Sequence, residues 1–451
     1  MKRWLAFVTI LTLLVGTVSA CGGGETGGET DDTGSVYFLN FKPEAEAAYK
    51  KVAADFTEET GIPIQVVTAA SGGYEQTLTS EIAKSEAPTI FQLNGPVGYE
   101  AWKDYCLDLS DTDLYRMLSD KSLAITEGDG VFGIPYTVEG YGIIYNDRIL
   151  QKYFKMEDSV VESAAEINNF ETLKAVVEDM TAKKGELGIE GVFASTSMAA
   201  GEQWRWQTHL ANLPFYYEFR DLGEDINPIT TGLGSETVSF SYNEEMKNIF
   251  DLYLRNSVTE PALIGGKTTV DSVAEFALGK AAMMQNGNWA ASQISEVGGS
   301  TVADEDIRFL PIYIGVEGEE NNGLCIGTEN YLAINNQASE ADQQASLKFL
   351  EWLFSSETGK SYVLNELGFI APFDTFEEGE TPTDPLGAEI IAWTSKDEIR
   401  SVPWAFTAFP SQEFKDRFGD ALMQYAQGSG DWGNVVNTVR DQWRSEYGLT
   451  H

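Results

Sequence analysis

Several of the ten tryptophans stand beside polar side chains rather than inside apolar runs. They are Trp204 and Trp206 in Glu202–Trp206, Trp289 after Asn288, and Trp404 after Pro403. A sugar presents hydroxyl groups at its edge and apolar C–H faces, so its site needs flat aromatic rings beside planar polar groups. Core packing is the alternative for each ring, and Trp206 could face away from Trp204 if the local backbone is extended. These four residues are candidate contacts of a carbohydrate.

Polar and aromatic groups also follow three short apolar runs, at 36–40, 64–68 and 88–93. Apolar residues at helical spacing lie between the runs, from Ala45 to Phe56 and from Tyr74 to Ser85. This βαβαβ order predicts an α/β fold with a parallel sheet covered by helices. Ligands of such sheets lie beyond the carboxyl ends of the strands. The positions there are Asn40, Phe41 and Lys42, the stretch 68–73, and Asn94 with Gly95.

Groups for catalysis and metal binding are scarce. The two histidines, His209 and His451, leave little for imidazole chemistry, and His209 lies in an aromatic helical stretch typical of a structural histidine. No CxxC pair or Cys/His cluster predicts a metal, and no phosphate-binding GxxxxGK[ST] loop follows a strand. We therefore expect no cofactor. Cys106 and Cys325 could pair, although free buried thiols are the preferred interpretation.

The charge balance excludes one class of partner. Seventy acidic and thirty basic residues give a formal charge of −40, which repels nucleic acid and anionic lipid surfaces. Acidity alone identifies no ligand. The length of the chain predicts two or more domains.

The first residues indicate export. A basic start, Met1-Lys2-Arg3, precedes an apolar run from Trp4 to Val18, which is typical of a secretory signal peptide over 1–20. The sequence Val-Ser-Ala before Cys21 resembles the lipobox of bacterial lipoproteins, which implies that Cys21 is acylated. An ordinary signal cleaved before Cys21 is the alternative. Residues 21–35 would form a lipidated, Gly-rich, flexible linker. We expect the protein on the extracellular face of the cell membrane, held there by its lipid alone.

Several segments together resemble one family. Residues 134–147, IPYTVEGYGIIYND, and 276–289, FALGKAAMMQNGNW, are similar to segments of the extracellular solute-binding proteins of carbohydrate ABC transporters, the maltose and maltodextrin type. Residues 323–334 resemble the return strand into the first lobe, and 354–360 a helix end that precedes a G-x-I-P motif. Here that motif reads Gly-Phe-Ile-Ala-Pro at 368–372, with one extra residue. The resemblance covers nearly the whole mature chain.

The resemblance implies a periplasmic-binding-protein type II fold. Two lobes with parallel-type sheets and flanking helices would be joined by a hinge, with a sugar in the cleft between them. The first lobe would comprise 36–137 plus 309–368, and the second 142–305 plus 372–451. The crossovers would lie near Thr137, Asp306 and Phe369. The lobes would close over the ligand.

The resemblance also implies roles for particular residues. It places Asn288 and Trp289 at the cleft and makes Glu139 a ligand carboxylate, with a solvated hinge residue as the alternative. Tyr141 would line the cleft or pack in the hinge. Glu329, beside Asn330, lies in the return loop, and Phe41 would stack on sugar or cover a helix end. The family implies a binding protein without enzymatic activity, expected to be monomeric, that delivers its ligand to ABC permease subunits.

Two other functions remain open at this stage. A binding protein of the same fold could take a peptide, polyamine or organic anion. No Arg cluster near the strand ends favours a carboxylate ligand, whereas the acidic balance permits a polyamine. A surface glycosidase would need two carboxylates about 5–9 Å apart, and no catalytic motif indicates one.

Overall fold

The computed structural model describes residues 33–223 and 227–450. The predicted signal peptide, Cys21 and most of the linker lie outside these residues. Among the described helices, none combines the length and the apolar character needed to span a bilayer.

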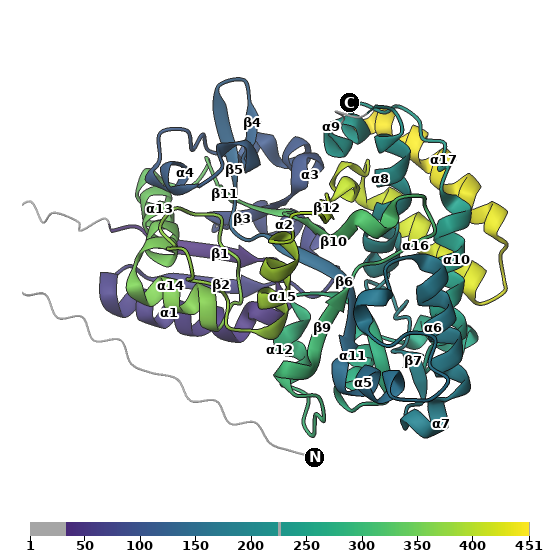
Figure 1. Ribbon diagram of the computed structural model, residues 1–451. Coiled ribbons are helices and arrows are strands. Elements are labelled where there is room, and N and C mark those ends of the chain that lie inside the picture. The colour runs from purple at the N-terminus through teal and green to yellow at the C-terminus, as the bar shows by residue number, and fades with distance from the viewer. Residues whose placement is uncertain (1–32, 224–226, 451) are drawn as a thin grey trace, which may run out of the picture. The chain divides into compact units, whose positions relative to one another are not determined.

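Two sheets organise the described chain (Figure 1). The first has the strand order β2-β1-β3-β11-β5-β4 and the second β12-β10-β6-β8-β7, with β9 also paired to β6. The strands of the first sheet are β1 Val36–Asn40, β2 Ile64–Thr68, β3 Ile90–Asn94, β4 Ile125–Glu127, β5 Gly130–Pro135 and β11 Asn330–Ile334. Those of the second are β6 Glu139–Asn146, β7 Gly191–Phe193, β8 Ala281–Gly287, β9 Ile307–Leu310, β10 Asn322–Gly327 and β12 Arg400–Val402.

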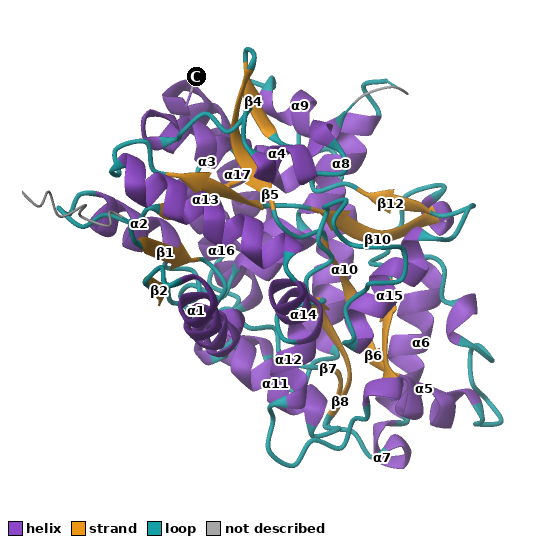
Figure 2. Cartoon of the chain, turned by 90° about the vertical axis from the view of Figure 1, so that its left-hand side faces the viewer, coloured by secondary structure: helices purple, strands orange, loops and turns teal. Residues whose placement is uncertain are grey.

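Helices complete a lobe around each sheet. The first lobe contains α1 Glu46–Thr60, α2 Tyr74–Ile82, α3 Gly95–Trp102, α4 Asp113–Met117, α13 Glu340–Ser355 and α14 Glu357–Asn365. The second contains α5 Asp147–Phe154, α6 Phe170–Ala182, α7 Lys184–Leu187, α8 Asn212–Arg220, α9 Pro228–Leu233, α10 Asn243–Arg255, α11 Thr269–Ala277, α12 Ala290–Ser295, α15 Pro385–Thr394, α16 Gln412–Ala426 and α17 Trp432–Thr450, with a π-helix at Arg205–Leu210. In the first lobe, α1 and α14 lie side by side (Figure 2).

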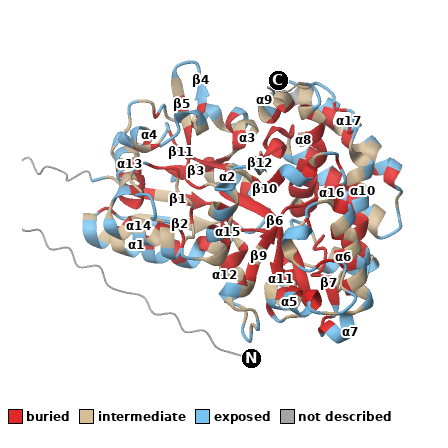
Figure 3. Cartoon of the chain, viewed as in Figure 1, coloured by how far each residue is buried: buried red, intermediate tan, exposed pale blue. Residues whose placement is uncertain are grey.

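Strand alternation builds two apolar layers on the first sheet. Phe38 and Ile90 point into a core that includes Tyr49 and Phe349, whereas Leu39 and Phe91 point to the other face. Successive strand residues face opposite sides, so helices on both faces can be packed. Buried residues accordingly follow the strands of both sheets (Figure 3).

The predicted βαβ unit is present, and the sheets as a whole are mixed. β1 pairs in parallel with β2 and β3. However, β11 is antiparallel to β3, and β6 is antiparallel to β8, β9 and β10. The expectation of parallel-type sheets is therefore wrong for these strands, because they are contributed by segments that return from the other lobe or turn back within it.

The chain crosses between the sheets three times. The first crossing, between β5 and β6, lies at Thr137 as predicted. The second, predicted near Asp306, is wrong: β9 and β10 still pair with β6, so the crossing falls at Thr328 and Glu329. The third was predicted near Phe369. Ile370 forms an isolated bridge with Val138, next to the first crossing, and packs against an apolar cluster of the second lobe. Phe373 returns to the core of the first lobe before α15 reaches the second sheet.

The predicted linker is shorter than expected. The backbone N–H and hydroxyl of Ser35 both donate to Asp342 Oδ1, at 2.7 and 3.0 Å. Gly34 lies so close to Ala341 that a Cβ on it would be 2.2 Å from the Ala341 carbonyl oxygen. The chain is therefore fixed to the start of α13 from Gly34 onward.

Candidate functional site

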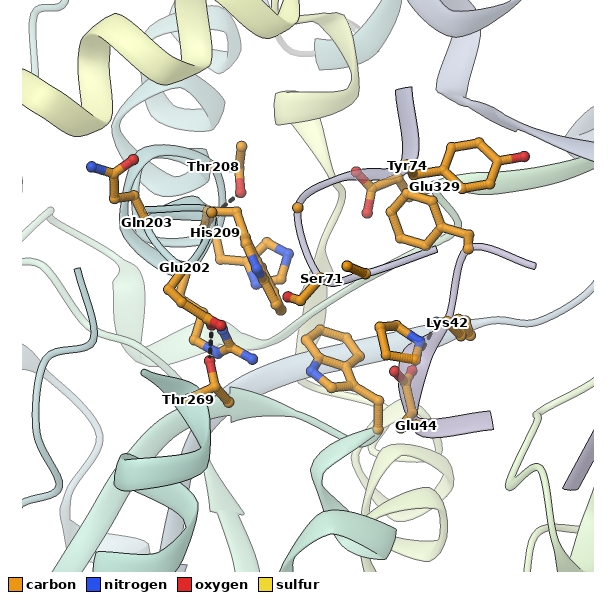
Figure 4. Close-up of a pocket in the computed structure, with 18 of the residues that line it drawn as sticks. Lys42, Glu44, Ser71, Tyr74, Glu202, Gln203, Thr208, His209, Thr269 and Glu329 are labelled. Atoms are coloured by element: carbon orange, nitrogen blue, oxygen red, sulfur yellow. Dashed lines mark hydrogen bonds and ion pairs between the residues drawn. The ribbon is translucent and has the colours of Figure 1, made fainter. Parts of the chain in front are cut away.

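A cavity of about 720 Å³ lies between the two lobes (Figure 4). This volume is within the range of about 300–1,000 Å³ that is usual for small-molecule sites. The loops that follow β1, β2 and β3 line it from the first lobe. The segment 201–209, α11, residues 289–297 and the start of α16 line it from the second. Any ligand inside would therefore contact both lobes.

Lys42 is held in place by the loop that follows β1. The Asn40 amide donates to the Lys42 carbonyl oxygen at 2.7 Å and accepts from the Lys42 N–H at 3.1 Å. Asn40 is fully buried, so its amide group needs hydrogen-bond partners within the protein. The two bonds to Lys42 provide them and hold the loop in place. Beside it, Phe41 packs on Tyr74 with ring centroids 5.1 Å apart.

A buried ion pair joins the two sheets at the base of the cavity. Lys42 Nζ lies 2.7 Å from Glu139 Oε1 and 3.8 Å from Glu44 Oε1. Lys42 and Glu139 are only 5 % and 4 % exposed. Burial lowers the pKa of Lys42, but Glu139 and Glu44 more than offset this, so that the pKa is raised. The ammonium group stays charged and fixes the position of the first strand of the second lobe.

The π-helix supplies four lining residues of the second lobe, Arg205, Gln207, Thr208 and His209. Its wide turn, in which the Ala211 N–H donates to the Trp206 carbonyl, lets several neighbouring residues reach the cavity. Trp204, which precedes it, and His209 line the cavity with ring centroids 4.9 Å apart. Burial, with help from nearby cations, lowers the pKa of His209 well below its usual range, so the imidazole is neutral at pH 7.

Arg205 occupies one face of Trp204. Its guanidinium carbon lies 3.7 Å from the centre of the indole, and Nη1 is 3.5 Å from Glu202 Oε2. Nε donates to Asn286 Oδ1 at 3.3 Å. Burial lowers the pKa of this guanidinium to about 9. Arg205 therefore stiffens the wall and orients the Trp204 ring.

Trp289 lies flat against Gly287 at the end of β8. A Cβ at Gly287 would be 2.1 Å from the six-membered ring of the indole, so only glycine leaves room for this arrangement. The ring is 6.0 Å from Trp204 and 5.4 Å from His209, centroid to centroid. Lys42 Nζ lies 5.8 Å from its centre. Trp204, His209 and Trp289 thus form an aromatic corner of the cavity.

The mouth of the cavity brings two glycine loops together. Gly72, after β2, and Gly201, before Trp204, both have positive φ angles, 68° and 81°. A Cβ on Gly72 would be 2.6 Å from the Gly201 carbonyl oxygen. The lobes therefore meet here through backbone atoms alone.

The cavity lining carries more acid than base. Seven carboxyl residues face three basic ones: Glu44, Glu75, Glu139, Glu202, Glu296, Glu329 and Asp416 against Lys42, Arg205 and Lys415. Burial raises the pKa of four of these carboxyls, those of Glu44, Glu75, Glu329 and Asp416. In the described chain, no three His, Cys, Asp or Glu groups are arranged to hold a metal ion.

Four polar atoms of lining residues have no hydrogen-bond partner within the described chain. They are Gln207 Oε1, Gln293 Oε1, Asn330 Oδ1 and Trp289 Nε1. Gln207 and Asn330 are 3 % and 2 % exposed. Buried polar atoms are nearly always paired in proteins, and of these four atoms Gln207 Oε1 lies against Gly419 of α16.

Comparison with known proteins agrees with this geometry. Residues 51–388 match the model of a family described as bacterial extracellular solute-binding protein. The chain belongs to this family. Among curated proteins, the search found no significant match.

Solved structures of solute-binding proteins share the fold. A chitin oligosaccharide binding protein has a TM-score of 0.72 at 18 % identity, covering 92 % of this chain and 100 % of that one. A sugar transporter from Bacillus licheniformis in complex with stachyose gives 0.69 at 17 %, covering 91 % and 100 %. The solute-binding protein RafE in complex with raffinose gives 0.67 at 17 %, covering 92 % and 99 %. The predicted two-lobed solute-binding fold is therefore confirmed.

Seven of the eleven residues predicted as ligand contacts line the cavity of this solute-binding protein. They are Phe41, Lys42, Asn94, Glu139, Trp204, Trp289 and Glu329. Asn94 and Asn330 pair directly across β3 and β11. Whether these residues contact a ligand stays a prediction.

The other four lie beneath the cavity, which corrects their placement. Trp206 is buried against Phe250 and Tyr253, and its Nε1 donates to the Ser197 carbonyl at 3.0 Å. It faces away from Trp204 because residues two apart lie on roughly opposite sides of a helix. Trp404 and Tyr141 are 1 % and 0 % exposed.

Tyr141 and Asn288 support the site from behind. Tyr141 stacks on His209, with ring centroids 4.2 Å apart and planes within 7°. Asn288 Oδ1 accepts from the Gly140 N–H at 3.0 Å and so extends the pairing of β6 with β8. Both residues position the aromatic corner without reaching the cavity.

Sequence reasoning missed several lining residues, most clearly His209 and the start of α16. His209 was interpreted as structural, and nothing in the sequence marked the wide π-helical turn that brings it to the cavity. Lys415 lies 85 residues after Asn330, the nearest lining residue outside α16, and the sequence analysis used only the apolar face of this helix. Free buried thiols were the preferred interpretation of the two cysteines. The structure agrees, because Cys106 and Cys325 are both free and buried.

Proposed function

We propose that this solute-binding protein captures a sugar or short oligosaccharide in the cavity between its lobes. The observation that carries the proposal is the aromatic corner of Trp204, His209 and Trp289 beside the Lys42–Glu139 pair. Apolar C–H faces of a pyranose stack on such rings, while charged and amide groups at the same depth bind its hydroxyls. The unpaired Asn330 oxygen would accept a hydroxyl hydrogen.

Cavity residues come from both lobes, and this supports a capture mechanism by closure. Lys42 and Asn94 belong to the first lobe, and Trp204 and Trp289 to the second. A ligand that contacts both lobes stabilises the closed arrangement by its differential affinity for it. The closed protein would then deliver the sugar to the transmembrane subunits of an ABC importer.

The location follows from the sequence rather than from the site. The family model describes extracellular proteins, and Cys21 follows a signal-like run. We infer that the chain is held at the extracellular face of the membrane by a lipid on Cys21. Fractionation of Cys21→Ala tests this inference: a variant that still carries the lipid would contradict it.

A glycan panel tests the ligand class. Raffinose, stachyose, maltotriose, xylotriose and chitotriose are added to the purified mature protein, and the melting temperature is measured. A ligand at 100 times its Kd stabilises the folded state by about 2.7 kcal/mol. Spermidine, a tripeptide and citrate serve as the alternative classes. Stabilisation by one of these alone would overturn the carbohydrate assignment.

The same samples test whether the protein is a binding protein without catalysis. Each stabilising glycan is incubated with the protein for a day, and the products are separated by chromatography. An intact glycan is the expected result. Time-dependent hydrolysis that is lost on Glu139→Gln would instead support a glycosidase.

A further inference from the structure

Two of the three cations that line the cavity, Lys42 and Arg205, are already paired with carboxylates of the protein, and the third, Lys415, acts on Glu329. Lys42 is paired with Glu139 at 2.7 Å and has Glu44 as a second carboxylate. Arg205 lies 3.5 Å from Glu202 and is stacked on Trp204. An acidic ligand would therefore have to displace an internal carboxylate in order to reach either charge.

The surplus charge of the lining is negative, and Glu329 contributes to it. Within the described residues, its carboxyl has no hydrogen bond and no ion pair. Burial raises the pKa of this carboxyl and Glu139 adds to the rise, whereas the charges of Lys415 and Lys42 oppose it. Glu329 lies between β10 and β11 and directly precedes Asn330, which pairs with Asn94 of β3. The close-up in Figure 4 shows Glu329 near Tyr74 on the first-lobe side.

Most of the unpaired polar atoms around the cavity are hydrogen-bond acceptors. Three of the four are amide oxygens, on Gln207, Gln293 and Asn330, and Gln207 Oε1 lies against Gly419 of α16. The fourth, Trp289 Nε1, is a donor. With the carboxyl of Glu329, the Gln293 and Asn330 oxygens would be satisfied by O–H or N–H groups of a ligand. An ionised carboxylate, sulfate or phosphate has no hydrogen to donate, and these oxygens would repel it.

We propose that the cavity selects glycans that carry only hydroxyl, acetamido or amino groups, and that Glu329 excludes glycans bearing acidic groups. This proposal rests on the carbohydrate function and narrows it to a ligand class. Glu329 then acts as a specificity-determining residue, because its carboxylate accepts ligand hydroxyls and repels ligand anions.

Matched neutral and acidic ligands test the proposal. Xylotriose is compared with its glucuronosyl derivative, maltotriose with its 6-carboxylate, and chitotriose with its 6-sulfate, by titration calorimetry. For the pair whose neutral member binds, we expect the acidic member to bind at least tenfold more weakly. We also expect this ratio to shrink in 1 M salt, because the repulsion is screened.

The variant Glu329→Gln ties the selectivity to one residue. It should bring the neutral-to-acidic affinity ratio at least threefold closer to one, whereas Glu58→Gln, which removes an exposed charge on α1 of the same lobe, should leave the ratio unchanged. An acidic member that binds as tightly as its neutral partner would overturn the proposal. So would a ratio that Glu329→Gln does not alter. If none of the neutral or acidic glycans binds, the proposed function itself fails, which is a distinct result.

Discussion

Two tryptophans of the second lobe lie against glycines on either side of the central strand β6, and only one of them faces the cavity. Trp289 rests on Gly287 of β8, which pairs with Tyr141. Trp404 rests on Gly327 of β10, which pairs with Glu139. The local arrangement of ring on glycine is the same in both places.

The difference lies in what covers the second face of each ring. Trp404 is covered by Tyr141 and Phe406, at 5.6 and 5.3 Å between centroids, and is 1 % exposed. Trp289 is only partly buried and borders the cavity. One ring therefore contributes to the stability of the lobe, and the other is available to a ligand. Sequence alone treated both as candidate contacts, because both follow a short polar or turn segment.

The largest expected effect is on folding. Trp404→Ala should lower the free energy of unfolding by about 3–5 kcal/mol, because it empties a fully packed site. Urea denaturation followed by circular dichroism measures this loss. A decrease below about 1 kcal/mol would mean that Trp404 is not part of the core.

Trp289→Ala should act on binding instead. Truncation of a contact aromatic costs about 2 kcal/mol of binding free energy, which is roughly a 30-fold loss of affinity. The melting temperature of the ligand-free variant should stay close to that of the wild type. Titration calorimetry with the best glycan from the panel provides the measurement, and unchanged affinity would remove Trp289 from the site.

Replacing Gly327 or Gly287 by alanine compares the two tryptophan sites with a smaller change, one added methyl group. Gly327→Ala places a Cβ 2.7 Å from the Trp404 ring and should cost at least about 1 kcal/mol of stability, the lower end of overpacking costs. Gly287→Ala places a Cβ 2.1 Å from the Trp289 ring, which can relieve the clash by moving into the cavity. This variant should weaken binding, by no more than Trp289→Ala does.

A double-mutant cycle separates positioning from general damage. If Gly287 acts only through the ring above it, Gly287→Ala should have no further effect on affinity in the Trp289→Ala background. Additive losses in the double variant would show that Gly287 supports the site in another way.

The smallest expected effect concerns pH. The pKa of Glu329 is raised by burial. Its protonated form therefore favours the folded state below the ordinary carboxyl pKa, about 4.3, and this contribution is lost as the pH rises through the folded-state value. Glu329→Gln cannot ionise, so it should melt higher than the wild type at pH 7 and equally at pH 4. Glu58→Gln is the control for the general loss of one negative charge, and an equal gain in both variants would contradict the assignment.

The sequence predicted the part of the site that depends on local order along the chain. The βαβ pattern alone led to Lys42 and Asn94, because a strand and the loop after it are read from neighbouring residues. Glu139 and Trp289 came from the resemblance, and Glu329 came from it as well. The crossing near Thr137 was also implied by the resemblance, and the structure has it between β5 and β6.

The remainder depends on contacts between distant segments. The antiparallel pairing of β9 and β10 with β6 cannot be read from either strand, so the second crossover was misplaced. His209 reaches the cavity through a π-helix, whose period differs from the 3.6 residues assumed in reading the pattern. Trp404 and Trp289 differ only in their far neighbours, which no local pattern contains.

The glycine contact at the mouth of the cavity gives lobe closure a fixed end point. Gly72 and Gly201 approach through backbone atoms, which have no rotamers to adjust and no charge to titrate. The limit of travel therefore does not depend on pH or ionic strength. A Cβ on Gly72 would lie 2.6 Å from the Gly201 carbonyl oxygen, whereas one on Gly201 would lie 3.3 Å from the Ser71 carbonyl oxygen. If the lobes close as proposed, a methyl group at Gly72 would therefore act as a spacer between them and widen the aperture through which a solute enters or leaves.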